Sequence, residues 1–267
     1  KKSRVKKILS LAKGKPVLAL GDVILDAYFT GKVERFSQEA PVPIIAIENE
    51  KFFPGGAGNA AACMAIIQLF PTLIAVVGGS EKIGYADVLE EECQKIGINT
   101  NFIKDQQRKT TLKMRLAAVK TTKQHVARVD IESKSNLSQE TEKTVLDLIN
   151  KIAEENNFLA ISLHDYRKGF LTEKIFRLAT YLSAQKSIPI FADLKQDTFI
   201  KFKNLIEVPG LFFLKPNQSE SAETAKLING FDKNGNTDEE IVQIGKIIQN
   251  ELPINIIITR GAKGAVS

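Results

Sequence analysis

The stretch EKFFPGGAGNAAACMAI, residues 50–66, places a pair of glycines directly before an alanine-rich segment. Glycine carries no side chain, so a polar ligand can approach the backbone closely at Gly55 and Gly56. The first N–H groups of a helix have no partner inside the helix and are free to bind such a ligand. The stretch therefore predicts a helix over 57–69 that begins at a ligand, and Asn59 can donate to and accept from sugar hydroxyls.

Residues 56–61 also fit the letters of the dinucleotide-binding pattern G-x-G-x-x-A. That pattern requires a buried strand that runs directly into the glycines. Here the preceding segment has the character of a β-hairpin that ends at Phe53-Pro54. A nicotinamide or flavin role is therefore disfavoured. A P-loop is absent, because the sequence contains no G-x-x-x-x-G-K-[ST] motif.

Elsewhere, short apolar runs alternate with helical segments, which is typical of a layered α/β protein. Near-continuous apolar strands flanked by helices predict a mostly parallel sheet covered on both faces. The last predicted helix should begin with Thr237 as N-cap and with Glu240 completing a capping box. The expected strands are 15–22, 72–79, 99–104, 158–165, 188–195, 211–217 and 254–264, and the expected helices are 57–69, 84–95, 138–156 and 172–184, with two more between 217 and 254.

Two regions have the pattern of short β-strands. VPIIAIENEKFFP at 42–54 groups β-forming residues around a polar turn, and TTLKMRLAAVKTTKQHVARVDIE at 110–132 contains two such runs joined by KTTKQ at 120–124. Neither region has a helical period. We therefore expect four short strands that form an antiparallel appendage outside the parallel core.

The composition is that of a globular protein with one large or two small α/β domains: 267 residues, 43% of them hydrophobic and 25% charged. The net charge of +6 suits binding of phosphorylated anions, but the lysines are spread along the chain, which disfavours nucleic acid. No apolar run reaches the roughly 18 residues that cross a membrane. We expect a cytoplasmic protein without a membrane partner, whose basic start is a solvated helix and whose Cys63 and Cys93 are reduced and buried.

Polar residues cluster at the carboxyl ends of the predicted strands, where ligands bind in open parallel sheets. For each of them a turn-forming or helix-capping role is about as plausible as a binding role. Taken together, five strand ends with polar groups at the same edge favour a binding site there. The residues are Asp22, Asp26, His164, Asp165, Asp193, Lys195, Lys215, Asn217, Thr259 and Arg260.

The ordered segments GDVILD, EAPVPI and PGGAGNAA resemble the ribokinase-like (pfkB) carbohydrate kinases. The resemblance extends from residue 16 onward through TLKMR, ARVDIE, LHDYRKG, FADLKQDTF, KPNQSE and ITRGAKG. SQEAPVP, DYRKG and DLK resemble more specifically the branch that acts on D-glycero-D-manno-heptose 7-phosphate. This implies a three-layer α/β/α fold with a small β lid. It also implies phosphoryl transfer from ATP with Mg²⁺ to O1 of that sugar phosphate, which supplies ADP-heptose for lipopolysaccharide.

The resemblance also implies roles for individual residues. The substrate-binding positions lie on the glycine stretch, the lid and the DY-x-KG turn: Asp26, Gly55, Gly56, Asn59, Lys113, Arg115, Asp165 and Lys168. The nucleotide-binding positions lie on the D-x-K, N-x-x-E and T-x-G segments: Asp193, Lys195, Asn217, Thr259, Arg260, Gly261 and Gly264. Asn217 and Glu220 are implied to hold magnesium through water. Lys113 and Arg115 can reach the 7-phosphate from the lid, but solvated strand positions are an equal alternative.

The catalytic base of the family is the aspartate of a Gly-Ala-Gly-Asp turn, and this motif does not occur in the sequence. The resemblance implies that the motif lies beyond Ser267, so the catalytic residue is unassigned. We expect residues 1–267 to be a kinase domain without its C-terminal part, with lid strands within 30–54 and 110–131 that pair two subunits. A pfkB kinase for another sugar or a nucleoside, or a non-catalytic binding module that ends near Ser267, stays open. His164 stands where a small hydroxyl residue is usual and is expected to be a packing residue.

Overall fold

A seven-stranded sheet in the order β11-β10-β9-β8-β1-β4-β5 forms the centre of the computed structural model, which describes residues 2–81, 83–119 and 123–267. Every neighbouring pair in this sheet is parallel. The sheet confirms the predicted mostly parallel core. Its strands are β1 Pro16–Gly21, β4 Phe70–Gly78, β5 Asn99–Asp105, β8 Ala160–His164, β9 Ile190–Asp193, β10 Phe212–Leu214 and β11 Asn255–Ile256.

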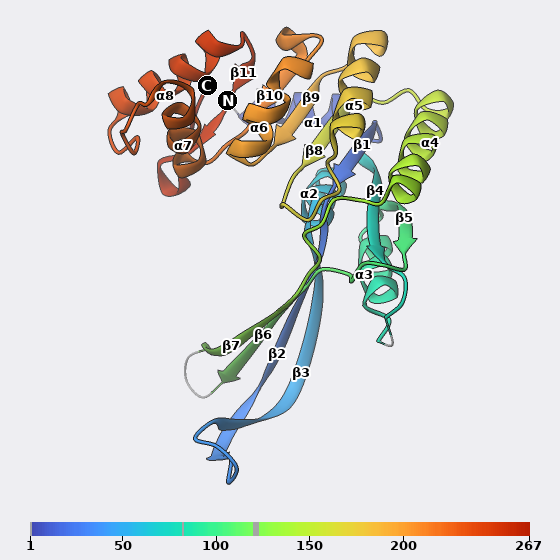
Figure 1. Cartoon of the computed structure of the whole chain (residues 1–267), viewed down its shortest axis with the longest axis vertical. Helices are drawn as coiled ribbons and strands as arrows, with labels where there is room; N and C mark the ends of the chain where they lie inside the picture. Colours follow the sequence, from blue (N-terminus) through green and yellow to red (C-terminus); the bar gives the residue numbers. More distant parts are fainter. Residues whose placement is uncertain (1, 82, 120–122) are drawn as a thin grey trace.

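Helices cover both faces of this sheet and make the three layers of the α/β/α fold (Figure 1). Leu18 and Leu20 of β1 belong to one core cluster and Ala19 to the other, as the two-residue period of a strand requires. The first cluster contains residues of α4, α5, α7 and α8, and the second contains residues of α2 and α3. The helices are α1 Lys2–Ala12, α2 Ala57–Ile66, α3 Tyr85–Lys95, α4 Gln139–Glu155, α5 Glu173–Lys186, α6 Gln196–Phe202, α7 Gln218–Asn229 and α8 Asp238–Glu251.

A second sheet projects from this core as a long arm (Figure 1). Its strands, in the order β3-β2-β6-β7, are β2 Val23–Phe36, β3 Pro43–Gly56, β6 Leu112–Val119 and β7 Lys123–Ile131. β2 pairs antiparallel with β3 and β6 with β7, but β2 and β6 run parallel. The prediction of a purely antiparallel appendage is therefore wrong.

The arm also corrects the predicted hairpin at 42–54. That segment is part of one continuous strand, because its polar centre lies on the exposed arm and pairs with β2, a strand that the sequence pattern did not predict. The second predicted turn, KTTKQ, falls largely on residues 120–122, which lie outside the described residues. Short pieces complete the chain: β12 Ile258–Thr259, β13 Ala265–Val266 and the 3-10 turns Lys203–Leu205, Pro209–Leu211 and Gly261–Lys263.

Beyond residue 254 the structure differs from the single strand predicted over 254–264. This segment is divided into β11, which joins the central sheet, and a small antiparallel hairpin of β12 and β13. The hairpin turns at Gly261–Lys263, where Gly261 and Gly264 have positive φ and the N–H of Arg260 donates to the carbonyl oxygen of Gly264. Ser267 follows β13 directly. The two glycines allow a reversal that the apolar pattern of the strand did not indicate.

Two local predictions also need correction. Thr237 caps α8 by accepting the N–H of Glu240 at 3.2 Å, but the Glu240 carboxylate accepts from the N–H of Asn236 instead of closing the box. Cys93 is buried as expected, whereas Cys63 is exposed, because it lies on the α2 face turned away from the sheet. Among the described residues, no helix has the length and apolar character needed to span a membrane.

Candidate active site

The predicted binding residues lie along one edge of the central sheet. Because all its strands are parallel, their carboxyl ends share this edge, and the strand order places the ends of β10 and β9 next to those of β8, β1 and β4. The segments that follow β10 and β11 therefore form one end of the edge, which we call the nucleotide end. The segments that follow β1, together with the start of α2, form the other, which we call the sugar end.

At the sugar end, Gly55 and Gly56 allow the end of β3 to lie very close to the start of β2. Gly56 precedes α2 with φ 60° and ψ −132°, and a Cβ there would overlap the carbonyl oxygen of Asp22. That carbonyl accepts the N–H of Ala57 at 2.8 Å. A Cβ on Gly55 would overlap the carboxylate of Asp26. The glycine pair therefore holds the start of α2 directly against the end of β1 and the base of β2.

Asp26 is already paired with a predicted lid cation. Arg115 Nη1 lies 2.5 Å from Asp26 Oδ1, and its guanidinium stacks on the Tyr28 ring at 4.9 Å from the centroid. The hydrogen bond to Asp26 raises the pKa of Arg115. Lys113 lies opposite Asp26 in the β2–β6 register. Within the described part of the chain, the side chains of Lys113 and Asn59 make no hydrogen bond or ion pair, so both are available to a ligand.

The DYRKG turn is held on the end of β1 by one buried carboxylate. Asp22 accepts the N–H groups of Tyr166, Lys168 and Phe170 at 2.8, 3.0 and 3.1 Å. Burial raises the pKa of Asp22, against the lowering effect of these three donors. Asp22 therefore fixes the turn that carries two predicted substrate-binding residues, Asp165 and Lys168.

Both of those residues have partners. Asp165 accepts from the N–H of Arg167 at 2.7 Å and from the Thr198 hydroxyl at 2.5 Å. The Lys168 ammonium donates to Glu132, the residue that follows β7. Hydrogen bonds from Lys134 and Lys168 lower the pKa of Glu132 to about 2, so this carboxylate is ionised at neutral pH.

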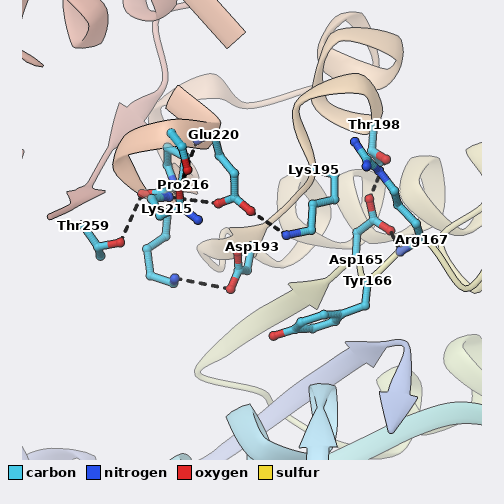
Figure 2. Close-up of polar contacts among 12 residues, drawn as sticks. Asp165, Tyr166, Arg167, Asp193, Lys195, Thr198, Lys215, Pro216, Glu220 and Thr259 are labelled. Carbon is cyan, nitrogen blue, oxygen red and sulfur yellow. Dashed lines mark hydrogen bonds and ion pairs between the residues drawn. The ribbon is translucent and has the colours of Figure 1, made fainter. Parts of the chain in front are cut away.

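Ion pairs join the nucleotide end to the segment that follows β9, and Figure 2 shows them side by side at the strand ends. Lys195 Nζ lies 2.5 Å from Glu220 Oε1 and 5.8 Å from the centroid of the Tyr166 ring. Lys215 Nζ lies 3.3 Å from Asp193 Oδ2. Burial, followed by the nearby carboxylates, raises the pKa of Tyr166 to about 12, so its hydroxyl stays protonated.

The predicted magnesium motif is a helix cap. The Asn217 side chain accepts the N–H of Glu220 at 2.9 Å, and Glu220 Oε2 accepts the N–H of Asn217 at 3.0 Å, which completes a capping box on α7. Burial alone would raise the pKa of Glu220, but the Asn217 N–H and the Lys195 ammonium outweigh burial and lower it. The carboxylate is therefore ionised, and both its oxygens are engaged before any ligand arrives.

A hollow of about 670 Å³ opens at the nucleotide end. Its wall includes four predicted nucleotide residues, Asn217, Thr259, Arg260 and Gly261, whereas Asp193, Lys195 and Gly264 lie outside it. Arg260 is 8% exposed and pairs through Nη1 with Asp238 at 2.6 Å. Its Nε and Nη2 atoms are buried and have no partner among the described residues. Such donors suit an anion, because an unpaired buried donor is costly.

His164 behaves as a packing residue. Its ring is buried, and Nε2 lies 2.6 Å from the Ser162 hydroxyl two residues back on the same face of β8. Burial lowers its pKa to about 4. The imidazole is therefore neutral at physiological pH and bonded within its own strand.

Residues 15–267 match the model of the pfkB family of carbohydrate kinases. The chain belongs to this family. It is 34% identical over 264 residues to the bifunctional protein HldE of Hyphomonas neptunium, covering 98% of this chain and 50% of that protein. It is 30% identical over 256 residues to the D-beta-D-heptose 7-phosphate kinase of Bordetella bronchiseptica, covering 93% of this chain and 72% of that protein. The chain thus spans about half the length of the bifunctional relative.

Solved structures support the ribokinase-like fold. Phosphofructokinase-2 of Escherichia coli, in complex with substrates and products, matches with a TM-score of 0.69 at 13% identity, over 94% of this chain and 74% of that one. The ribokinase of Arabidopsis thaliana, complexed with ribose and ATP, matches with a TM-score of 0.57 at 12% identity, with the same coverage. The predicted fold class and the carbohydrate-kinase assignment are confirmed.

Sequence reasoning assigned no site role to three residues of this edge. Tyr166 lies inside the DYRKG motif, but the motif pointed only to its charged members. Glu132 ends the quoted segment ARVDIE, and its position after a predicted strand was the available signal. Arg108 lies in a polar connection without a motif, and its contacts become visible only in the fold.

Proposed function

We propose that this chain is an ATP-dependent kinase of a sugar phosphate, with D-glycero-D-manno-heptose 7-phosphate as substrate and its O1 hydroxyl as the phosphate acceptor. The product would be the 1,7-bisphosphate used to make ADP-heptose for lipopolysaccharide. The heptose assignment draws support from the names of the relatives above and from SQEAPVP, DYRKG and DLK. We further propose that the enzyme works in the cytoplasm.

One observation carries the proposal: a continuous series of contacts joins the two ends of the edge. Thr259 forms a β-bridge with Asn217, and the N–H of Asn217 donates to Glu220. Glu220 in turn accepts from the Lys195 ammonium, which lies over the Tyr166 ring. Tyr166 in turn donates its N–H to Asp22, which holds the start of α2. A transfer enzyme must bind donor and acceptor in one site, and this series of contacts supports a single site along the edge.

Charge supports an anionic sugar. Lys168 and Lys113 lie at the sugar end, and the Lys113 ammonium has no partner among the described residues. Arg115 is paired with Asp26, so Lys113 is the better candidate for a phosphate contact on the arm. Phosphoryl transfer relies mainly on positioning and on neutralising phosphate charge, which cations at this edge provide.

Magnesium fits this site through water. Among the described residues, no group of three or more His, Cys, Asp or Glu side chains is placed to hold a metal. Magnesium usually keeps several waters and takes one or two carboxylates. Glu220, ionised and next to Asn217, would hold such a hydrated ion, which would neutralise the phosphate oxygens of ATP.

The group that removes the proton from the sugar hydroxyl is unassigned. Residues 1–267 contain no Gly-Ala-Gly-Asp turn, and the only Gly-Ala-Gly in the sequence, which begins at Gly56, lies at the sugar end. The placement of the base beyond Ser267 stays a prediction. A purified chain that extends past Ser267 into such a turn should release ADP faster than residues 1–267 alone, and equal rates would contradict the prediction.

The arm is also the proposed dimer surface. Ile44, Ile47, Phe36 and Val129 on its strands are exposed. Exposed apolar residues on open sheet edges favour pairing with a second sheet. A homodimer in sedimentation at micromolar concentration would support this arrangement, and a monomer would contradict it.

The test of the proposed function is ADP formation with ATP, Mg²⁺ and heptose 7-phosphate by a purified chain that extends past Ser267 into the Gly-Ala-Gly-Asp turn. We expect ADP release with this sugar phosphate and little with ribose or fructose. A Lys168→Met variant should lose the preference for the phosphorylated sugar. Lys174→Met, an exposed lysine of α5 that pairs with Glu142 of α4, is the matched control. Turnover of ribose or fructose alone would reject the heptose assignment. Binding of ATP and sugar phosphate without ADP release would favour a binding module.

A further inference from the structure

Three connecting segments meet where the arm joins the core, and Arg108 ties them together. Its Nη1 donates to the carbonyl oxygen of Ser135 at 2.6 Å, and its Nη2 donates to the carbonyl oxygen of Lys168. These three residues lie on different connections. The connections are 106–111 between β5 and β6, 132–138 between β7 and α4, and 165–172 between β8 and α5.

Arg108 is a buried cation that has no direct carboxylate partner among its hydrogen bonds. Burial lowers its pKa, while the charges of Asp105 and Asp22 act in the opposite direction. A buried charge is costly unless hydrogen bonds satisfy it. The planar guanidinium offers several donors in a fixed fork, so one side chain can hold two carbonyls on separate segments. A lysine at this position has a single ammonium and cannot do this with the same geometry.

Lys168 is held at three points, each by a charged residue. Its N–H donates to Asp22 Oδ2 at 3.0 Å, its carbonyl accepts from Arg108, and its ammonium donates to Glu132. The two backbone contacts lie on either side of its Cα. They therefore fix the direction in which the side chain leaves the turn, and Glu132 fixes where the ammonium ends. The Lys168 side chain is only 12% exposed.

We propose that Arg108 is a positioning residue that directs the Lys168 ammonium toward the phosphate group of a sugar phosphate. Arg108, Asp22 and Glu132 together hold Lys168 in place, and we call these three residues the holder. This inference rests on the proposed function, because it takes Lys168 as a phosphate contact. Since Arg108 also holds the segment that leaves β7, it links the arm to the same lysine. Loss of Arg108 should therefore reduce discrimination between phosphorylated and unphosphorylated sugars more than it reduces sugar binding itself.

The experiment is a double-mutant cycle with Arg108→Lys and Lys168→Ala in the whole chain. Titration calorimetry measures the dissociation constants for heptose 7-phosphate and for unphosphorylated heptose. Arg108→Lys should weaken binding of the phosphorylated sugar about tenfold and change heptose binding less than about twofold. In the Lys168→Ala background, the same substitution should change either constant less than about twofold. Arg177→Lys, in an exposed pair on α5, is the matched control.

The outcomes separate the two proposals. Equal weakening for both sugars, or a full tenfold loss that persists without Lys168, would show a purely structural Arg108 and overturn the inference. Failure of the unmodified chain to bind heptose 7-phosphate would reject the proposed function and the inference with it. Should Arg108→Lys not fold, Glu132→Gln tests the same holder, because it keeps the shape of the side chain but removes the carboxylate that fixes the Lys168 ammonium. Weaker binding of the sugar phosphate, only when Lys168 is present, would support the holder, and unchanged or tighter binding would refute it.

Discussion

At the sugar end of the sheet edge, Gly56 lies directly against the backbone of Asp22, and Gly55 lies against the Asp26 side chain. At the nucleotide end, the polar residues are joined by side-chain pairs instead. Lys195 pairs with Glu220 at 28% and 15% side-chain exposure, and Lys215 pairs with Asp193 at 48% and 26%. Backbone contacts cannot exchange partners without moving a strand, whereas partly exposed ion pairs are weak and can re-pair with a phosphate.

The comparison predicts that substitutions at the two ends change different properties of the protein, namely its stability and its affinity for nucleotide. Substitutions that push on the backbone at the sugar end should destabilise the fold, because core packing tolerates little displacement. Substitutions of paired side chains at the nucleotide end should affect nucleotide affinity more than stability. The predictions below test this division, from the largest expected effect to the smallest.

The largest effect is expected for Gly56→Ala. Gly56 has positive φ, and an added Cβ would overlap the carbonyl oxygen of Asp22, which is backbone and cannot rotate away. Backbone strain and overpacking together should lower the unfolding free energy by about 4 kcal/mol. Gly55→Ala is the matched control, because its Cβ meets the Asp26 side chain, which can move.

Urea unfolding and sugar titration distinguish the two glycines. Gly55→Ala should keep most of the stability but weaken sugar binding, because Asp26 is displaced from Arg115. Equal loss of stability in both variants would contradict the proposed difference between backbone and side-chain neighbours.

A smaller effect, dependent on pH, is expected at His164 between the two ends. Burial holds its folded-state pKa at about 4, below the ordinary 6.5. As the pH falls from 6.5 to 4, the unfolded chain binds a proton that the folded chain does not, so the unfolding free energy decreases. The difference of about 2.5 between the two pKa values corresponds to about 3 kcal/mol.

Chemical unfolding at a series of pH values measures this effect. His164→Gln keeps a partner for Ser162 but cannot titrate, so its stability should decrease less than that of the unmodified chain between pH 6.5 and 4. Parallel pH curves for the two proteins would mean that His164 does not contribute to the acid sensitivity.

Asn217 tests the nucleotide end more directly, because it has a capping role in the fold and a proposed role in binding ATP. Asn217→Ala removes the side-chain cap of α7 and should cost about 1 kcal/mol in thermal or urea unfolding. Asn217→Ser can still cap the helix and should recover most of that stability. If Asn217 also binds nucleotide, the serine variant should still bind ATP more weakly than the unmodified chain. Equal ATP affinity in Asn217→Ser and the unmodified chain would limit Asn217 to capping.

The sequence predicted the parallel core, because each of its strands is a local apolar run, and it placed the polar strand ends along one edge. It did not predict β2 as a long strand, since the pairing of Val23–Phe36 with both β3 and β6 depends on segments distant in the chain. The role of Arg108 was hidden for the same reason. Its partners are backbone carbonyls 27 and 60 residues away. Every residue has a backbone carbonyl, so the amino-acid sequence does not show which ones accept a hydrogen bond.

The smallest effect is expected for Lys215→Gln. The Lys215–Asp193 pair is wide at 3.3 Å and the lysine is half exposed, so water screens it and its loss should change the unfolding free energy by less than about 0.5 kcal/mol. Thermal unfolding without ligand should therefore be nearly unchanged. The stabilisation that saturating ATP adds should become smaller, because a cation next to the phosphates has been lost. A clear loss of stability without ATP would mean that this pair holds the fold, and the nucleotide end would then resemble the sugar end.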